Sequence, residues 1–376
     1  MRIGIDAHAA ERDGSGNCTY IRGLIRGLLE LDRENDYILY VIDENHPFYR
    51  EIREGSEIRL HPLRIKGPLL RIPVFLAAAT YRDPIDVLHV QYIAPPRHRG
   101  KLVVTIHDLA FLHVPRTFSR LEALRSRLLV PGTARAAERI ITGSESSKRD
   151  IAANCGVEPS KVEVIPYGVS GSFAEKRDGE NNRSIPAKYG IQAPYILCVG
   201  RLNARKNLTV LAEAFSLAKK RQALPHTLVI VGKKDHGSGG VLRSVRKTGS
   251  GDVLFTGFVP DEDLPGLYAR ADVLVYPSLF EGFGFPVVEA MASGVPIVAS
   301  DTPALRETMG DAGWAVNPVQ AEEMAAAICS LVKDERLRRD HIAKGLARAA
   351  EFTWLRTARM TLAVYEQAAA ARRKRN

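Results

Sequence analysis

Short apolar runs alternate with longer amphipathic segments along this chain of 376 residues. Runs rich in Val, Ile, Leu and Tyr are typical of buried strands, and the segments between them have the spacing of covering helices. Strands separated by helices indicate parallel sheets that are covered on both faces. We therefore expect an α/β fold, with strands at 2–6, 37–42, 86–90, 102–106, 139–142, 162–165, 195–199, 227–231, 253–256, 273–276 and 295–299.

A polar stretch between Ser170 and Pro186 divides this pattern into two halves. It is rich in charged residues and Asn and poor in apolar side chains, so we interpret it as a linker. Each half is long enough to bury its own hydrophobic core. We place a first domain at residues 1–183 and a second at 184–355.

Composition narrows the choice of partners and compartment. The formal net charge of +10 predicts an anionic partner, which could be a nucleotide, a nucleic acid or a membrane surface. The four cysteines are scattered without a C-x-x-C pair, which favours reduced thiols in the cytoplasm over a structural zinc site. The first strand starts at Arg2 and no apolar run reaches membrane-spanning length, so we expect neither a signal peptide nor a transmembrane helix.

The segment Phe118–Arg135 combines leucines with arginines at helical spacing. A basic amphipathic helix of this kind is typical of a segment that lies on an anionic lipid surface. A solvated helix that covers the core of its own domain explains the same pattern equally well. Both interpretations stay open at this point.

Two glutamates, Glu281 and Glu289, stand eight residues apart across a glycine-rich turn between an expected strand and an expected helix. Backbone N–H groups at such a turn point away from the carboxyl end of the strand and favour anions. We expect Glu289 in the first helical turn, where it either complements the helix dipole or accepts hydrogen bonds from sugar hydroxyls.

Two cations, Arg201 and Lys206, flank the turn after the strand 195–199. The helix dipole disfavours cations at a helix start, and a bound phosphate would remove this conflict. Charge-assisted hydrogen bonds contribute about 1.5–3 kcal/mol each, more than the dipole. We therefore expect these side chains to bind a diphosphate rather than to pair with neighbouring acidic residues.

The first half carries two weaker signals. Gly14 and Gly16 lie between the first strand and its helix, but Thr19 interrupts the dinucleotide fingerprint, so a tight turn is the alternative. His107 and Asp108 follow a strand directly, and the carboxyl edge of an open α/β sheet is where ligands bind. A turn histidine is the alternative for His107. The sequence shows no clustered His and carboxylate set for a metal.

Taken together, these motifs make the chain resemble the retaining glycosyltransferases of family GT4. The E-x7-E element matches Glu281 and Glu289, the Gly-Arg-Leu…Arg-Lys-Asn turn matches 200–207, and the T-x-H-D element matches 105–108. With the glycine loop, the matching elements extend from the first strand to the last helices. The resemblance is greatest to bacterial polysaccharide mannosyltransferases.

This resemblance implies the GT-B architecture, in which two Rossmann-like βαβ domains face each other across a cleft. It implies a C-terminal helix, about residues 356–376, that packs back on the N-terminal domain. It also implies roles: diphosphate binding by Arg201 and Lys206, ribose binding by Glu289, and sugar contacts from Glu281. The implied catalytic set is His107, Arg201, Lys206 and Glu281, and the implied donor-binding set is Gly14, Gly16, Arg201, Lys206, Val259, Glu281, Phe283, Gly284, Phe285 and Glu289.

The implied reaction is retaining transfer of a hexose, with mannose from GDP-mannose favoured, to a glycan or lipid-linked acceptor. The resemblance implies no cofactor and no metal, a cytoplasmic location with the inner membrane face as a candidate surface, and no nucleic-acid partner. Three alternatives are a UDP-sugar donor, a non-hydrolysing nucleotide-sugar 2-epimerase and a non-catalytic nucleotide-sugar-binding protein. The family often has N-G-V-D where this chain has Tyr167-Gly168-Val169-Ser170, so we assign no role to Tyr167 or Ser170.

Overall fold

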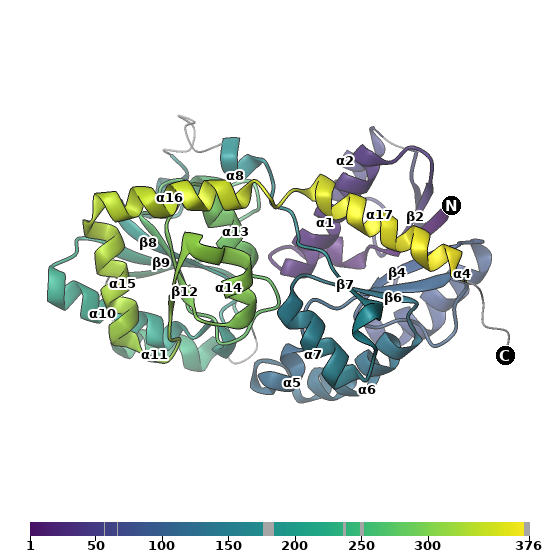
Figure 1. Ribbon diagram of the computed structural model, residues 1–376, viewed down its shortest axis with the longest axis horizontal. Helices are drawn as coiled ribbons and strands as arrows, with labels where there is room; N and C mark the ends of the chain where they lie inside the picture. The colour runs from purple at the N-terminus through teal and green to yellow at the C-terminus, as the bar shows by residue number, and fades with distance from the viewer. Residues whose placement is uncertain (56, 66, 176–183, 236–237, 249–251, 372–376) are drawn as a thin grey trace. The chain divides into compact units, whose positions relative to one another are not determined.

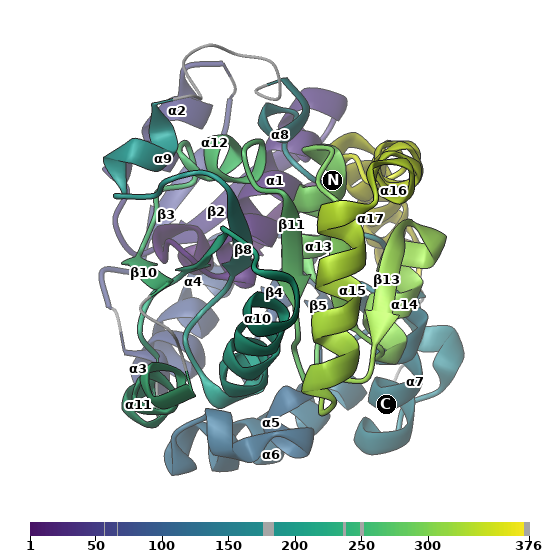
Figure 2. The same ribbon diagram turned by 90° about the vertical axis from the view of Figure 1, so that its left-hand side faces the viewer.

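The computed structural model describes residues 1–55, 57–65, 67–175, 184–235, 238–248 and 252–371. The chain forms two compact units. The first unit contains Met1–Leu112, Leu121–Gly168 and Trp354–Asn376, and the second contains His113–Arg120 and Val169–Thr353. Both are α/β units with parallel sheets, as the sequence predicts (Figures 1 and 2).

The first unit is built on a seven-stranded sheet with the order β3-β2-β1-β4-β5-β6-β7. Chain order reverses between β1 and β4, and open sheets of this kind bind ligands at the carboxyl edge near such a reversal. The strands are β1 (Arg2–Asp6), β2 (Asp36–Val41), β3 (Arg59–Pro62), β4 (Val87–Gln91), β5 (Lys101–Thr105), β6 (Arg139–Thr142) and β7 (Val162–Val164). Its helices are α1 (Gly16–Leu31), α2 (Pro47–Arg53), α3 (Pro68–Leu70), α4 (Ala77–Arg82), α6 (Arg120–Ala136), α7 (Glu145–Cys155) and α17 (Trp354–Ala370), and the short α5 (Ala110–His113) ends at its border.

The C-terminal helix α17 belongs to the first unit, as the family resemblance implies. It runs along α1 in Figure 1 and packs on it, and the Tyr365 hydroxyl lies 2.6 Å from Nδ1 of His89 on β4. The two helices approach closely because Gly23 on α1 has no side chain. A Cβ atom at Gly23 would lie only 2.1 Å from the indole ring of Trp354.

The second unit is built on a six-stranded parallel sheet with the order β10-β9-β8-β11-β12-β13. The strands are β8 (Tyr195–Val199), β9 (Thr227–Val231), β10 (Val253–Gly257), β11 (Val273–Tyr276), β12 (Ile297–Ser300) and β13 (Gly313–Val316). Its helices are α8 (Ser172–Glu175), α9 (Ile185–Lys188), α10 (Leu208–Gln222), α11 (Ser238–Thr248), α12 (Leu264–Tyr268), α13 (Phe285–Ala292), α14 (Pro303–Met309), α15 (Ala321–Lys333) and α16 (Glu335–Ala349). The apolar faces of α10 and α15 pack on this sheet and form much of the core.

The structure adds two strands that the apolar pattern does not predict, β3 and β13. Both are mostly half-buried, so their sequences, RLHP and GWAV, lack the continuous apolar run of a buried strand. The border between the two units falls after Gly168, earlier than the expected limit at 183. Residues 176–183, which hold much of the expected linker, lie outside the described residues, so the domain limits stay a prediction.

The contact between α1 and α17 gives a first testable prediction. Gly23→Ala should destabilise the protein by about 1–3 kcal/mol, because the new methyl group forces the Trp354 indole out of its position. Gly132→Ala in α6 is the matched control, since nothing lies within 4 Å of its added Cβ. The control should leave stability unchanged or raise it by up to about 1 kcal/mol. Equal urea midpoints for Gly23→Ala and the native protein would contradict the prediction.

Candidate functional site

The candidate site in the second unit begins where β11 ends. The loop after β11 carries Glu281 and leads into α13 through Gly284, whose φ of 99° favours glycine. A Cβ atom at Gly284 would also lie 2.6 Å from the Leu305 side chain. Gly294, with a φ of 67°, follows the end of α13 as predicted.

Glu281 is held by cations from the turn between β8 and α10. The ammonium of Lys206 donates to Oε1 of Glu281 at 2.6 Å and to the hydroxyl of Tyr276, the last residue of β11. Arg205 lies 3.8 Å from the other carboxylate oxygen. The side chains of Lys206 and Glu281 are each only 8% exposed, so this is a buried ion pair.

The charges of this pair are set by opposing effects. Burial raises the pKa of Glu281, but the positive charges of Arg205 and Lys206 outweigh burial and lower it to about 2. Burial lowers the pKa of Lys206, and the negative charge of Glu281 partly offsets this effect. The carboxylate is therefore ionised at neutral pH and cannot serve as a general acid.

The expectation that Arg201 and Lys206 do not pair with neighbouring acidic residues is wrong. Lys206 pairs with Glu281, and Arg201 lies 3.8 Å from Asp235, in the turn after β9. Asp235 is brought near because the turns after β8 and β9 pack tightly, with Gly200 and Gly232 in contact. Adjacent parallel strands end at the same edge, so acidic residues from distant parts of the sequence meet these cations there.

Glu289 lies in a different environment from Glu281. The sequence predicted that Glu289 lies in the first turn of the helix. It is instead the fifth residue of α13, so it lies in the second turn. Its side chain is buried, and the Tyr268 hydroxyl donates a hydrogen bond of 2.7 Å to Oε2. Burial raises the pKa of Glu289 to about 7, although the bond from Tyr268 lowers it in part. A role in complementing the helix dipole does not explain a buried carboxyl beyond the first turn.

One aromatic residue of the loop, Phe283, is packed inside the second unit. Phe283 is buried against Phe285 and Phe352, and its carbonyl accepts a hydrogen bond of 2.7 Å from Thr308. Val259 is buried as well, next to Phe258, which is partly exposed. The side chain of Phe283 therefore stabilises the loop that carries Glu281.

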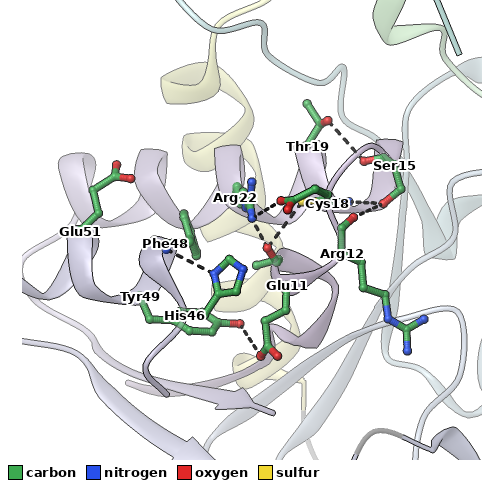
Figure 3. A network of polar contacts seen from close by, with 12 residues as sticks. Glu11, Arg12, Ser15, Cys18, Thr19, Arg22, His46, Phe48, Tyr49 and Glu51 are labelled. Carbon is green, nitrogen blue, oxygen red and sulfur yellow. Dashed lines mark hydrogen bonds and ion pairs between the residues drawn. The ribbon is translucent and has the colours of Figure 1, made fainter. Parts of the chain in front are cut away.

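In the first unit, the loop with Gly14 and Gly16 is braced from the side of α1 (Figure 3). Gly14 has a φ of 74°, and Ser15 caps α1 by accepting from the backbone of Cys18. Arg22, further along α1, donates to the Ala10 carbonyl at 2.8 Å and to Asp13 at 2.7 Å. The Arg22 contacts thus hold the chain before Gly14, and the Ser15 cap holds it at the start of α1.

His107 lies just beyond the end of β5 and is buried within the first unit. Its Nδ1 lies 2.8 Å from the Tyr167 hydroxyl, and its Nε2 lies 2.9 Å from the amide oxygen of Gln91. Burial lowers the pKa of His107 to about 3, so the ring is neutral at physiological pH.

The structure thus places the predicted residues in two groups. His107, Gly14 and Gly16 belong to the first unit. Around the carboxyl edge of the second sheet lie the other predicted residues, which are Arg201, Lys206, Val259, Glu281, Phe283, Gly284, Phe285 and Glu289. Sequence reasoning missed Arg205, Tyr268 and Tyr276 at this edge, and in the first unit it missed Gln91 and Tyr167, which contact His107. The position of Arg205 in the same basic turn as Lys206 was the available signal.

Among the residues that the structure describes, no group of three or more His, Cys, Asp or Glu side chains could hold a metal ion. None of the described helices combines the length and the apolar character that a membrane span requires.

Comparisons with known proteins agree with this architecture. Residues 16–172 match the family model described as Glycosyltransferase Family 4, and residues 193–334 match that of Glycosyl transferases group 1. O-antigen chain mannosyltransferase B of Escherichia coli is 29% identical over 82% of this chain and 81% of its own length. MMP alpha-(1->4)-mannosyltransferase of Mycolicibacterium hassiacum is 34% identical over 63% of this chain and 56% of its own length.

A solved structure is similar over nearly its whole length. Anabaena Alr3699/HepE in complex with UDP-glucose superimposes with a TM-score of 0.76 at 18% identity, and the alignment covers 98% of this chain and 100% of that chain. At this identity the likeness establishes a shared fold.

The raised pKa of Glu289 predicts a dependence of stability on pH. The carboxyl ionises near pH 4.5 in the unfolded chain but only near pH 7 in the folded protein, so ionisation favours unfolding between these values. Between pH 4.5 and pH 8, the free energy of unfolding of the native protein should fall by about 3 kcal/mol relative to that of Glu289→Gln. Urea unfolding across this range measures the difference.

Glu281→Gln serves as the comparison. Glu281 has a lowered pKa, so its contribution to stability is complete above about pH 4.5 and is lost as the pH falls toward 2. Between pH 6 and pH 8 the stability difference between this variant and the native protein should therefore stay constant. Parallel pH profiles for Glu289→Gln and the native protein would show that Glu289 titrates normally.

Proposed function

Because the chain belongs to the family 4 glycosyltransferases, we propose that it transfers mannose from GDP-mannose with retention of configuration. The acceptor we propose is a glycan or a lipid-linked saccharide in the synthesis of a cell-surface polysaccharide. Support for mannose comes from the relatives, since the O-antigen chain mannosyltransferase aligns over most of both chains.

The observation that carries this proposal is the charge arrangement around Glu281. Two cations, Lys206 and Arg205, face one buried carboxylate, so the cluster keeps one excess positive charge. A donor diphosphate at this edge would be attracted by that charge and by Arg201, which is partly exposed. Glu289 is the carboxyl we assign to the ribose hydroxyls, and Glu281 to the hydroxyls of the transferred sugar.

We assign the charge stabilisation of the reaction to these cations. In the transfer step the bond from the anomeric carbon to the phosphate oxygen breaks, and a bond to the acceptor oxygen forms on the same face. The proton of the acceptor hydroxyl passes to the leaving phosphate. Lys206 and Arg205 stabilise the negative charge that develops on this leaving group, which is the role a metal ion has in other transferases.

The state of the two candidate catalytic groups fits this mechanism. Glu281 is ionised and paired with Lys206, which makes it a weak nucleophile and excludes it as an acid. His107 is neutral, and both of its ring nitrogens already contact side chains of its own unit. When the leaving phosphate takes the proton of the acceptor, neither Glu281 nor His107 has to change its protonation state.

A UDP-sugar is the second candidate donor. The observation that favours it is the similar structure from Anabaena, which is a complex with UDP-glucose. We assign contact with the base to residues 257–260, which include the buried Val259. Direct competition between GDP-mannose and UDP-glucose decides between the two donors.

Donor binding and transfer test the proposal. GDP-mannose should raise the melting temperature more than UDP-glucose does, because a ligand that binds only the folded state stabilises it. Mannose should appear in a saccharide product, and GDP release should require the acceptor. Conversion of the donor without an acceptor would indicate an epimerase, and donor binding without turnover with any acceptor would indicate a binding protein.

The role of Glu289 is tested with Glu289→Ala. Loss of hydrogen bonds to the ribose should raise the activation free energy by about 1.5–3 kcal/mol. This lowers kcat/KM roughly tenfold to more than a hundredfold. Glu213→Ala, an exposed glutamate on α10 of the same unit, should leave turnover unchanged. If Glu289→Ala turns over donor at the native rate, the ribose assignment is wrong.

We also propose that the first unit binds an anionic membrane surface through α6. Four leucines of this helix, Leu121, Leu124, Leu128 and Leu129, are 46–68% exposed, although apolar residues of this size are usually buried. Arginines at 120 and 127 accompany them on the same helix. Apolar side chains that insert between lipids and cations that contact their anionic head groups together favour this partner.

Sedimentation with phosphatidylglycerol vesicles tests this proposal. The native protein should pellet with the vesicles at low salt and less at high salt, because salt screens the contribution of the arginines. Replacing both Leu121 and Leu128 with Ser should weaken binding roughly tenfold or more, since each buried leucine contributes about 1.5–3 kcal/mol. Val319→Ser, which changes an equally exposed apolar residue of the second unit, should not. Absence of binding at both salt concentrations would exclude the membrane proposal.

A further inference from the structure

Tyr167 occupies a position where this chain departs from its family motif, and the structure places its hydroxyl against His107. The hydroxyl lies 2.8 Å from Nδ1 of the histidine. On the other side of the ring, Gln91 at the end of β4 places its amide oxygen 2.9 Å from Nε2. His107 therefore lies between two neutral partners that come from different elements of the first unit.

The orientation of the Gln91 amide determines where the protons lie. An amide oxygen only accepts hydrogen bonds, so Nε2 of His107 must carry the proton and donate it. Nδ1 is then the acceptor, and the Tyr167 hydroxyl donates to it. This assignment needs a protonated tyrosine, and burial raises the pKa of Tyr167 well above 10. The hydrogen bonds run in one direction, from Tyr167 through His107 to Gln91.

Aromatic packing holds the ring in this orientation. The Tyr20 ring lies 4.8 Å from the His107 ring, edge to face, and also packs on Tyr167 at 4.7 Å. The Tyr92 ring lies 5.6 Å away from the histidine on the chain segment that follows Gln91. Rotation of the imidazole would have to displace these rings, so packing and hydrogen bonds favour the same position.

The least anchored member of the three is Gln91. Its amide nitrogen is buried and has no hydrogen-bond partner among the described residues, whereas Tyr167 is 1% exposed and packs on the ring of Tyr20. A ligand hydroxyl could therefore replace the Gln91 oxygen at Nε2 more readily than it could replace Tyr167 at Nδ1. Such a hydroxyl would meet an N–H donor and not a base.

We propose that Tyr167 and Gln91 are positioning residues that hold His107 in its neutral, Nε2-protonated form. His107 then donates a hydrogen bond to a hydroxyl of the saccharide and does not abstract a proton from it. This inference rests on the proposed function as far as the saccharide is concerned. The state of the ring itself can be measured in the protein without any ligand.

Nitrogen NMR of the histidine side chains tests the ring state. In the full-length protein at pH 7, His107 should show a protonated Nε2 and an unprotonated Nδ1, with the signals identified by their loss in His107→Asn. Tyr167→Phe removes the donor to Nδ1, so the Nδ1 signal should shift. Tyr37→Phe removes the hydroxyl of another buried tyrosine, one that bonds Asp32, and should leave the His107 signals unchanged.

Kinetics with the matched variants test the positioning role. Tyr167→Phe should lower kcat roughly tenfold, the effect of one lost buried hydrogen bond, with KM for the donor nearly unchanged. Gln91→Glu keeps an acceptor for Nε2 and should preserve the Nε2-protonated signals, whereas Gln91→Met should lose them.

Two results would overturn the inference: a native His107 protonated at Nδ1, which is the pattern expected if the Gln91 amide is reversed, or an unchanged Nδ1 signal in Tyr167→Phe. Both are read without substrate, so they stand whether or not the protein transfers mannose. Native NMR signals as expected together with an unaffected kcat in Tyr167→Phe would overturn the positioning role of Tyr167 in the reaction.

Discussion

The buried ion pair between Lys206 and Glu281 is the constraint on which the candidate donor site depends. Removing two charges from water is costly, and their mutual attraction compensates only when further partners are present. Here Arg205 and the Tyr276 hydroxyl supply those partners. The pair fastens the loop after β11 to the turn after β8, so the edge of the sheet is shaped before any ligand arrives. Loss of one partner would leave an uncompensated buried charge and would cost about 3–5 kcal/mol of stability.

The two glutamates of the E-x7-E motif show how neighbouring groups give identical side chains different pKa values. Both side chains are about 8% exposed, and this burial by itself disfavours ionisation of each. Glu281 faces two cations and has a pKa of about 2, whereas Glu289 faces a tyrosine and has a pKa of about 7. Glu281 is therefore a fixed negative charge at neutral pH. Glu289 changes its protonation state near neutral pH, so the strength of the hydrogen bonds that it accepts from hydroxyl groups depends on pH.

Around His107 the first unit relies on neutral polar groups, although it also holds a buried ion pair between Arg71 and Asp6 at the end of β1. His89 lies within β4 and His107 just beyond the end of β5, and burial lowers the pKa of both to about 3. Tyrosine hydroxyls contact each of them, from Tyr365 and Tyr167. The Tyr365 contact joins α17 to the sheet, and the Tyr167 contact orients the candidate catalytic histidine. The direct partners of His107 are neutral, so its position does not require a charge to be desolvated there.

The sequence by itself determined the α/β class, the parallel arrangement and most strands, because a strand buried on both faces requires a continuous apolar run. The limits predicted for β1, β6, β8, β9 and β11 agree with the structure. The half-buried strands β3 and β13 escaped prediction because they do not need such a run. The sequence also pointed to Lys206, Glu281 and Glu289 through their positions at expected turns.

Only the tertiary structure decided which groups meet. Lys206 and Glu281 are 75 residues apart in sequence, His107 and Tyr167 are 60 apart, and Tyr268 and Glu289 are 21 apart. The first two pairs form because parallel strands end at a common edge, so segments that are distant in sequence become neighbours there. The third forms because α12 packs against α13. Burial and the charges brought near each group then set its pKa, and both are properties of the packed fold that no local pattern of residues contains.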